Sequence, residues 1–566
     1  MCMNPPVQTQ TQPVGFAPIL RHYFERCDIA GIIDNNVPLD SRRTVLTHGQ
    51  ASIALITSIL YQTFQLYHVC KFAEDTNIMN VILPGIASDE YFDDRLADTL
   101  DALYHRGLGD LDLLITRNMI QQFDIQSHIC HNDTTSASVY GNCNNNLTDK
   151  SIKITFGYSK KHRQDLKQFV WSLSVSSDSA FPLFQQAYSG NTADVQTYVE
   201  QWEHLIDLLG RRDFLYVADS KLLSKDNMAY IYDNEGFFLA PAPMYDSYKT
   251  VFETALDNHT TEYLIPYKGQ FNRGFEVPLH ISHNDKMYPL RMIILYDPGL
   301  FTRQSKALEN RIEKTKEAFK ELEVKLNKYN LKTQDAIDKA CTDILTKYQT
   351  VEFFEYTISN APETIYKNVK RGRPASGKAP EKITIIKDKF RINLSFQNDA
   401  FEHELFRCGY YPLITNKPQN ELSVKDAMMA HKNQYKSEHT FRRAKSEYSL
   451  EPIYLHTPER IEAFLFLFKI ALQIIVLIER TDRKNITERD KGLDNFRPNR
   501  KDVRNPKTEH LLKEFQYIVK GQMSLPDGKC VYFVSELNEL QKDILTILEV
   551  PFQCFTYAYL FDSGDG

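Results

Sequence analysis

The residues of this chain whose types and spacing most suggest chemistry lie between positions 426 and 446. This stretch contains no Pro or Gly and begins with an Asp, so it predicts a helix. His431, Gln434, Glu438 and Lys445 follow at steps of three, four and seven residues, which keeps their side chains on one helix face. That face would carry an imidazole, an amide, a carboxylate and an ammonium group. Such a stripe is also typical of an ordinary solvated helix face.

Two upstream aspartates favour a catalytic interpretation of this stripe. Asp133 lies in an extended run over residues 125–133, and Asp219 ends a buried apolar run over residues 213–219. Taken alone, Asp133 is compatible with a turn or cap ahead of two threonines, and Asp219 with the cap of a following helix. Their placement together with Glu438 predicts three carboxylates that meet at one metal site.

The elements that must position these acids alternate between strands and helices. Beyond the two runs above, the pattern predicts strands over 151–156, 169–175 and 236–240, a helix over 193–209 capped by Thr192, and a helix from Ser224. Three antiparallel strands continued by β–α units form a mixed sheet flanked by helices. The predicted fold class is therefore α/β, with a ribonuclease-H-like catalytic domain.

The composition excludes several classes of protein. The chain has 566 residues and an apolar fraction of 42%, which is ordinary for a globular protein of several domains. Its formal net charge of −6 is not that of a strongly basic protein, so binding of nucleic acid has to come from local patches. Nine cysteines without a Cys-x-x-Cys pair argue for reduced thiols and against a structural zinc site.

The most apolar segment, within residues 458–480, is predicted to be a buried core helix rather than a membrane span, because Lys469 and Gln473 interrupt it. The remaining patterns divide the chain into domains. We expect a disordered tail over 1–15, an all-helical N-terminal domain over 16–125, a catalytic core over 126–245 and 405–482, an insertion over 246–404, and a basic linker with a C-terminal unit over 483–566. The N-terminal domain is interpreted either as a packing domain or as a DNA-binding domain.

The insertion contains two patterns of its own. Apolar residues recur at alternating steps of four and three at Leu308, Ile312, Thr315, Phe319, Leu322, Leu326 and Tyr329, which predicts a helical hairpin or a dimerising coiled coil. Arg371 and Arg373 belong to an Arg-Gly-Arg-Pro sequence, which can lie in an AT-rich minor groove or serve as a charged flexible linker. Residues 383–386 and 390–394 are predicted as strands.

Six short motifs occur in a fixed order: His131-Asn-Asp-Thr-Thr-Ser136, the segment from Gly157 to Gln168, Gly190-Asn-Thr192, Val217-Ala-Asp219, Leu223-Ser-Lys225, and the segment from Glu438 to Lys445. Together they resemble the bacterial insertion-sequence transposases of the DDE superfamily. The resemblance is to the branch whose third acid lies in a Tyr-(2)-Arg-(3)-Glu-(6)-Lys signature, and it runs from about residue 25 to 550.

The resemblance implies that Asp133, Asp219 and Glu438 are catalytic and bind two divalent ions, Mg²⁺ or Mn²⁺. Phosphodiester hydrolysis and 3′-hydroxyl transfer both need two hard cations about 4 Å apart, held by carboxylates. The implied function is a DNA transposase that cleaves insertion-sequence ends and transfers strands into target DNA. The implied partners are the terminal inverted repeats, the target DNA and a second copy in a homodimer, with no membrane. The implied location is the bacterial cytoplasm, at the nucleoid during the reaction.

The same resemblance assigns DNA contacts. Lys445 is expected to face the DNA backbone as a point charge. In the loop over 157–165, Lys160, Lys161 and Arg163 are suited to binding phosphates, although a solvated basic loop has the same composition.

The chain departs from the signature at two positions expected to contact DNA. His431 and Gln434 stand where the family has Tyr and Arg, and neither has the permanent charge of a guanidinium group. The departure admits a catalytically inactive relic that still binds DNA. A separate alternative is a ribonuclease-H-like nuclease that hydrolyses DNA without joining strands.

Overall fold

The computed structural model describes residues 8–39, 45–140, 143, 151–157, 163, 165–259, 261–369, 382–496, 500–525 and 529–561. The chain forms two compact units. Unit 1 comprises Met1–Pro243, His280–Arg291 and Ile414–Gly566, and unit 2 comprises Met244–Leu279 and Met292–Leu413. All three predicted catalytic acids belong to unit 1.

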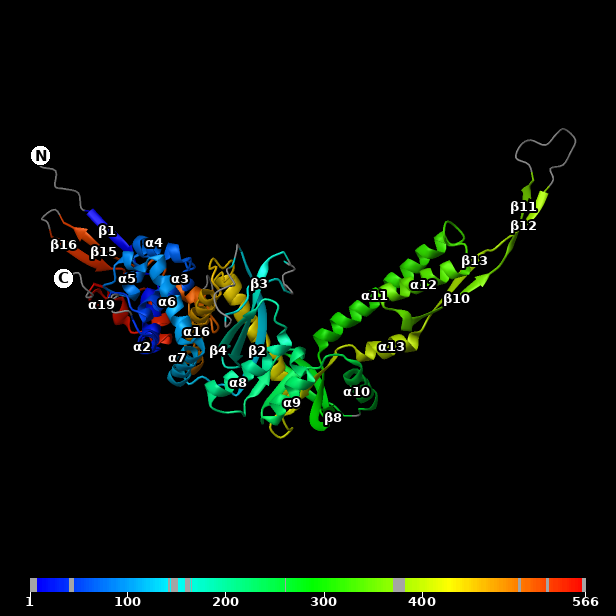
Figure 1. Cartoon of the computed structure of the whole chain (residues 1–566), viewed down its shortest axis with the longest axis horizontal. Helices are drawn as coiled ribbons and strands as arrows, with labels where there is room; N and C mark the ends of the chain where they lie inside the picture. The colour runs from blue at the N-terminus through cyan, green and yellow to red at the C-terminus, as the bar shows by residue number, and fades with distance from the viewer. Residues whose placement is uncertain are drawn as a thin grey trace, which may run out of the picture. The chain divides into compact units, whose positions relative to one another are not determined.

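The sheet of unit 1 is organised around five strands in the order β4-β3-β2-β5-β6 (Figure 1). Their bounds are β2 Ile129–Val139, β3 Lys167–Ser176, β4 Pro182–Ser189, β5 Leu215–Val217 and β6 Phe237–Pro241. Strand β3 pairs antiparallel with β2 and β4, whereas β5 pairs parallel with β2 and β6. This mixed sheet is compatible with the predicted ribonuclease-H-like core.

The third strand of this sheet is not the one that the sequence predicted. Residues 151–156 make only an isolated bridge, between Thr155 and Gln168, so the prediction of a strand there is wrong. The missing strand is β4, which begins at Pro182 and has its first four residues buried. A strand that opens with proline and is buried on both faces lacks the alternation by which strands are recognised.

The helices that follow β4 and β5 begin at different kinds of cap. Helix α8 spans Tyr198–Leu209, because Asp194–Gln196 forms a separate 3₁₀ turn, so the prediction of a helix capped by Thr192 is wrong. Helix α9 spans Lys225–Asp233 and begins as predicted, since the Ser224 hydroxyl accepts a hydrogen bond from the Asn227 backbone N–H at 3.2 Å.

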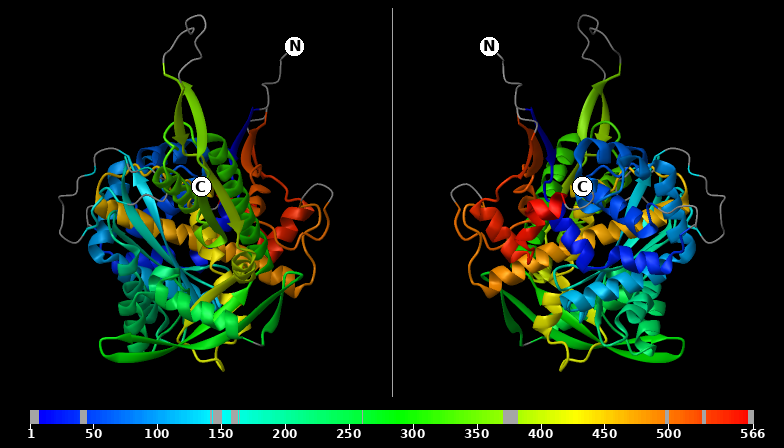
Figure 2. Two further views of the ribbon diagram at one scale, coloured as in Figure 1. Left: turned by 90° about the vertical axis from the view of Figure 1, so that its right-hand side faces the viewer. Right: turned by 90° about the vertical axis from the view of Figure 1, so that its left-hand side faces the viewer.

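Helix α16, Pro458–Glu488, is the central helix of unit 1 and contacts α3, α6 and β4. Figure 2 shows the orange α16 against the blue N-terminal helices. Those helices are α1 Ala17–Arg26, α2 Ile29–Asn36, α3 His48–Leu60, α4 Leu66–Thr76, α5 Ile78–Ile82, α6 Asp93–Arg106 and α7 Leu108–Phe123. By length and composition α16 is apolar enough to cross a membrane, but 94% of its most apolar window is buried inside the protein. It is the buried core helix that the sequence predicts.

The two polar residues of α16 are accommodated by a buried network. Lys469 Nζ donates to Asp112 Oδ1 at 2.6 Å and to Thr116 Oγ1 at 2.5 Å. Gln473 Nε2 donates to Thr116 Oγ1 at 3.1 Å and to the Pro182 carbonyl oxygen at 2.8 Å. The network ties α16 to α7 and to the start of β4.

The two ends of the chain meet in a small second sheet of unit 1. Strand β1, Gln8–Pro13, pairs antiparallel with β15, Val519–Ser524, which pairs with β16, Cys530–Val534. Figure 2 shows the dark-blue β1 beside the orange β15 in both views. The prediction of a disordered tail up to residue 15 is therefore wrong for β1. The other elements of this region are α17 Thr508–Lys513, α18 Glu539–Ile547 and α19 Tyr557–Phe561.

Unit 2 contains a helical hairpin and antiparallel strand pairs, among them β10 with β13 and β11 with β12. Its elements are α10 Asp246–Asn258, β7 Tyr263–Tyr267, α11 Pro298–Lys325, α12 Gln334–Tyr348, β10 Phe354–Asn360, β11 Glu363–Asn368, β12 Lys382–Lys387, β13 Phe390–Phe396 and α13 Asn398–Arg407. Strands β8 Gln270–His283, β9 Lys286–Tyr296 and β14 Tyr410–Thr415 have residues in both units.

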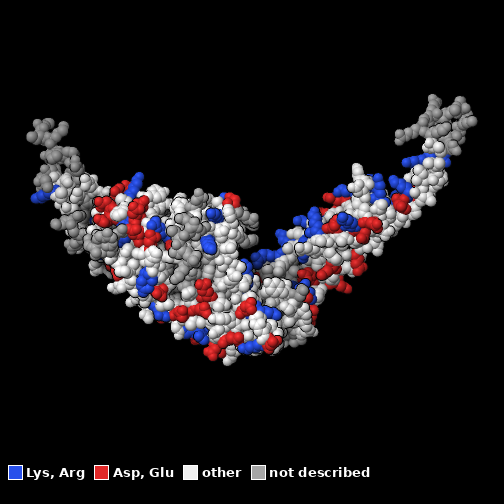
Figure 3. Space-filling model, in the orientation of Figure 1, with Lys and Arg blue, Asp and Glu red and all other residues white. Residues whose placement is uncertain are grey.

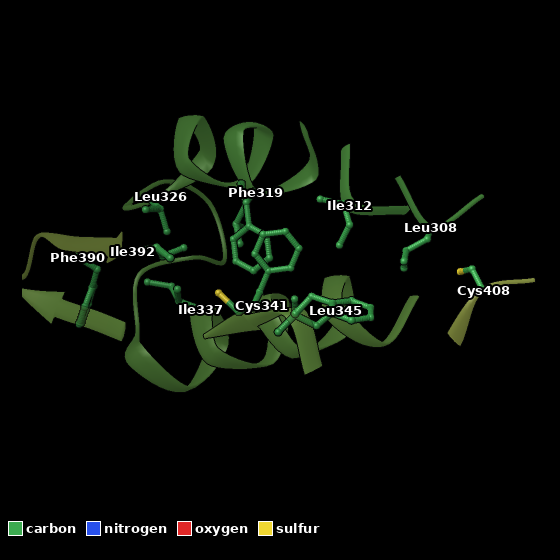
Figure 4. Packing of buried hydrophobic residues seen from close by; sticks show 13 residues of the cluster. Leu308, Ile312, Phe319, Leu326, Ile337, Cys341, Leu345, Phe390, Ile392 and Cys408 are labelled. Atoms are coloured by element: carbon green, nitrogen blue, oxygen red, sulfur yellow. The ribbon is translucent and has the colours of Figure 1, made fainter. Parts of the chain in front are cut away.

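The apolar stripe of α11 is covered within the chain. Leu308, Ile312 and Phe319 pack in one buried cluster with residues of α12 and of the β10–β13 pair, such as Leu345 and Ile392 (Figure 4). The last position of the predicted repeat differs, because α11 ends at Lys325 and Tyr329 is 81% exposed. The stripe thus forms the core of an intramolecular hairpin.

Candidate active site

The two faces of β2 have different environments. On one face, Asn132 Nδ2 donates to Ser172 Oγ at 3.1 Å, to Ser174 Oγ at 3.0 Å and to Gln201 Oε1 of α8 at 3.3 Å. Because side chains alternate along a strand, the even-numbered residues of β2 next to Asn132 face α8. The odd-numbered residues, which include Asp133, face the other way.

The opposite face of the sheet packs against α15, Tyr435–Arg442, and against α16. Trp171, which is paired with Thr135 in the register of β2 and β3, meets the Phe441 ring at a centroid distance of 5.5 Å and the Phe468 ring at 6.2 Å, both edge-on. Residue 135 has the same parity as residue 133. The Asp133 side chain therefore lies on the face of the sheet that α15 covers.

Asp133 and Asp219 come after the last paired residues of two adjacent strands. The parallel pairing of β2 with β5 ends at His131 opposite Val217. Asp133 continues β2, whereas Asp219 lies two residues beyond the end of β5 and is the N-cap of the 3₁₀ turn Ser220–Leu223. Both residues therefore lie toward the same edge of the sheet, and the meeting of their carboxylates stays a prediction.

Glu438 comes from a helix that is shorter than predicted. Helix α14 spans Val424–Lys432, two residues separate it from α15, and residues 443–447 form a π-helical turn. The prediction of one continuous helix over 426–446 is therefore wrong. A break and a π turn both change the phase of the helix, so a constant step of 3.6 residues does not relate the positions on either side. Glu438 lies in the first turn of α15 and is exposed.

Lys445 still reaches the site, but from the π-helical turn. Its Nζ donates to Thr135 Oγ1 at 2.7 Å and to the Ser136 carbonyl oxygen at 2.8 Å, and it lies 3.5 Å from Glu451 Oε1. Thr135 is the next residue after Asp133 on the α15 face of β2. The ammonium group thus lies beside the strand that carries the first acid.

The two positions that depart from the family signature are uncharged for different reasons. Burial and the nearby Lys432 lower the pKa of His431 to about 4, so its imidazole is neutral at pH 7. Gln434 is an amide and precedes α15 at its N-cap position. Neither side chain supplies the positive charge that an arginine would bring to a DNA backbone.

Each carboxylate has its own environment. Asp133 Oδ1 accepts from the Thr134 backbone N–H at 2.7 Å. Asp219 Oδ1 accepts from the Tyr198 hydroxyl at 2.5 Å and from the Lys221 backbone N–H at 2.9 Å. The contribution of Tyr198 has no signal in the sequence, since it depends on where α8 begins.

A hard divalent metal ion requires several oxygen ligands close together. Carboxylate oxygens are the ligands that Mg²⁺ and Mn²⁺ prefer, so the chemistry of the donor set fits a hard divalent ion. Among the residues that the structure describes, no three His, Cys, Asp or Glu side chains are gathered closely enough to hold a metal ion. Asp133 and Asp219 follow neighbouring ends of β2 and β5, and Glu438 is not gathered with them into a metal-binding group among the described residues.

Most of the predicted basic contacts cannot be placed. Lys160, Lys161, Arg371 and Arg373 lie outside the described residues. Arg163 is described, and its guanidinium forms two hydrogen bonds of 2.8 Å with the carboxylate of Asp165.

A polar cleft of about 580 Å³ borders α15. Its lining includes Lys436, His439 and Arg442 of α15 together with Arg483 and Lys507. These residues come from three separate segments, so no local pattern in the sequence marks them as a group. The cleft is also lined by Glu447, Glu479 and Glu509, and Arg483 forms an ion pair with Glu479, so it gathers charged side chains of both signs beside the helix that carries Glu438.

Comparisons with known proteins identify the family of the chain. Residues 132–474, more than half of the chain, match a family model described as "Transposase DDE domain". Residues 9–116 match a second model described as "Domain of unknown function (DUF4277)". No curated protein matches the chain. The first match spans all three predicted acids and the whole of unit 2.

Proposed function

This chain belongs to the transposase DDE-domain family, and we propose that it cleaves DNA at the ends of an insertion sequence and joins the freed strands to target DNA. Asp133, Asp219 and Glu438 are the proposed catalytic residues. The observation that supports the proposal is the parallel pairing of β2 with β5, because Asp133 and Asp219 each follow the last paired residues, His131 and Val217, by two positions.

We propose that the three carboxylates together hold two divalent ions, Mg²⁺ or Mn²⁺. When bound between carboxylates and a DNA phosphate, such ions activate the attacking oxygen and stabilise the leaving one. Glu438 is exposed and its side chain has several rotatable bonds, so it is free to turn toward the sheet when DNA enters. In this proposal Asp133, from β2, and Asp219, the N-cap of the 3₁₀ turn after β5, supply the fixed part of the site.

Lys445 acts in this proposal as a positioning residue for β2 and as a point charge near the DNA backbone. Its hydrogen bonds to Thr135 and Ser136 hold the strand next to Asp133. A phosphate that approaches the acids would meet its ammonium group. His431 and Gln434, both neutral, would contribute at most neutral hydrogen bonds to DNA.

The remaining DNA contacts are proposed on chemistry alone. Lys160, Lys161, Arg163, Arg371 and Arg373 are the kinds of side chain that bind phosphates or a narrow minor groove. Arg163 would have to exchange its ion pair with Asp165 for a phosphate. We further propose that two copies of the chain act together on the two ends of the element, and that this takes place in the bacterial cytoplasm.

The experiment that tests the function is cleavage of a DNA fragment that carries the element's own ends, with Mg²⁺ or Mn²⁺. We expect cuts at the end boundary that require metal and disappear in Glu438→Gln. The matched control is Glu447→Gln, which changes another exposed carboxylate nine residues along the same segment. Cuts that persist in Glu438→Gln would remove this residue from the mechanism.

Two further outcomes separate the alternatives. Products joined to a supercoiled target plasmid require strand transfer, so their absence despite cleavage would indicate a nuclease. Binding of the ends without cleavage by the native chain would indicate an inactive relic, for which the neutral residues His431 and Gln434 offer a physical reason.

A further inference from the structure

The distal part of unit 2 is a two-stranded ribbon without a core of its own. Strands β11 and β12 pair antiparallel from Glu363 opposite Lys387 to Asn368 opposite Lys382 (Figure 1). None of their residues belongs to the buried cluster between α11, α12 and the β10–β13 pair. An isolated pair of strands is at best marginally stable in water. The ribbon therefore has both faces available for a partner.

Several large apolar side chains on this ribbon are exposed. Tyr366 is 65% exposed, Ile383 is 49% exposed and Ile386 is 73% exposed. The register puts Ile386 and Tyr366 on one face, and Ile383 on the other face. Exposed apolar side chains of this size are typical of a surface that contacts a partner.

The charge on the ribbon indicates what kind of partner fits. Lys367, Lys382 and Lys387 form no ion pair with any residue that the structure describes. The acidic Glu363 is already paired with Lys389, at 2.9 Å. Figure 3 shows basic side chains on this end of unit 2. The unpaired charge of the ribbon is thus positive, which suits a polyanion.

We propose that the β11–β12 ribbon is an arm that binds duplex DNA by entering the major groove. The groove is about 12 Å wide and admits a two-stranded ribbon, whose strands are about 5 Å apart. The register puts Lys382 on the face of Tyr366 and Ile386, and Lys367 and Lys387 on the other face, from which their long side chains can reach phosphates on the groove walls. Tyr366 and Ile386 face base edges, where thymine methyl groups offer apolar contacts. This inference rests on the proposed function, because it gives the transposase a second DNA contact remote in sequence from the acids.

The test is the salt dependence of binding to duplex DNA by the full chain, with EDTA present so that no metal-dependent reaction takes place. The variant is Lys367→Ala/Lys382→Ala/Lys387→Ala. Each phosphate contact contributes about 0.9 to the slope of log K against log salt concentration, so we expect a decrease in the slope of roughly 2 to 3. We expect the affinity at low salt to fall at least tenfold.

A matched control is Lys320→Ala/Lys332→Ala/Lys339→Ala, which removes three exposed lysines from the helical hairpin of the same unit. It should leave the slope unchanged. An unchanged slope in the ribbon variant would overturn the proposal. Equal losses in both variants would also overturn it, because they would indicate a diffuse charge effect of unit 2.

A second variant, Tyr366→Ser/Ile386→Ser, distinguishes DNA from another copy of the chain. We expect weaker DNA binding with an unchanged sedimentation coefficient. A shift from dimer to monomer with DNA affinity retained would show that the ribbon contacts a second copy instead. Because these measurements need no cleavage, loss of the ribbon proposal and loss of the proposed catalytic function are separate outcomes.

Discussion

Removing one partner of the buried Lys469–Asp112 pair should strongly destabilise unit 1. Lys469 is 0% exposed and Asp112 is 2% exposed, and their charged atoms are 2.6 Å apart. Lys469→Met keeps the length of the side chain but leaves the Asp112 carboxylate buried without its cation. Loss of one partner of a buried ion pair costs about 3 to 5 kcal/mol, which is a large part of the stability of most domains.

The double variant Lys469→Met/Asp112→Leu should recover most of that loss. It removes both charges together, and such replacements are often neutral or stabilising. We therefore expect its free energy of unfolding to lie within about 2 kcal/mol of the native value. The coupling between the two sites should then amount to several kcal/mol, which a double-mutant cycle with Asp112→Leu would measure.

Tryptophan fluorescence during urea unfolding is a suitable assay. The chain has two tryptophans, and both Trp171 and Trp202 are buried in unit 1. The Trp171 ring packs against Phe468, the neighbour of Lys469 in sequence. The signal thus follows the unit that contains the pair, while unit 2 does not contribute.

The pH dependence provides an internal check of this prediction. Burial raises the pKa of Asp112 even with Lys469 beside it, and without Lys469 the pKa should rise further. A carboxyl group with a raised pKa favours the folded state at low pH and loses that contribution as pH rises. The cost of Lys469→Met should therefore be smaller at pH 5 than at pH 8. A cost below 1 kcal/mol at pH 8, with no dependence on pH, would refute the assignment of a buried charged pair.

Substitutions at two other residues have defined expectations. Asp482 is fully buried, both its carboxylate oxygens lack a hydrogen-bond partner among the described residues, and burial raises its pKa from 3.8 to about 7. Asp482→Asn should stabilise unit 1 at pH 8 by about 4 kcal/mol and change little at pH 3; a destabilised variant at pH 8 would contradict this. Lys445→Met should lower the unfolding free energy by about 1 to 3 kcal/mol, and Lys445→Arg should lower it less. Equal losses in the two Lys445 variants would contradict a role for the positive charge.

The strand that ends just before Asp219 and the start of α9 were predictable, because local sequence pattern decides them. The buried apolar run that ends at Asp219 became β5, and Ser224 caps α9 as expected. The core helix α16 was also predictable, because apolar side chains occupy nearly its whole circumference. The polar residues that argued against a membrane span, Lys469 and Gln473, are buried with partners from α7 and β4.

The predictions that failed depend on partners distant in sequence. Strand β1 is a polar Gln/Thr segment that forms a strand through pairing with β15, more than 500 residues away. The phase of the helix from 426 to 446 changes at a break and at a π turn. The hydroxyl of Tyr198 reaches Asp219 because α8 begins later than local signals indicate. The pairing of β1 with β15, the change of helix phase and the Tyr198–Asp219 hydrogen bond cannot be read from the spacing of residues along the chain.

The central claim, that Asp133, Asp219 and Glu438 act at one metal site, is tested most directly by Fe²⁺-dependent cleavage of the polypeptide. With added hydrogen peroxide as oxidant and ascorbate to return Fe³⁺ to Fe²⁺, Fe²⁺ in place of Mg²⁺ generates hydroxyl radicals that cut the backbone next to the bound ion. With DNA present, we predict cuts near all three residues that excess Mg²⁺ suppresses and that Asp219→Asn abolishes. Cuts confined to one segment, or cuts unchanged in Asp219→Asn, would contradict a shared site.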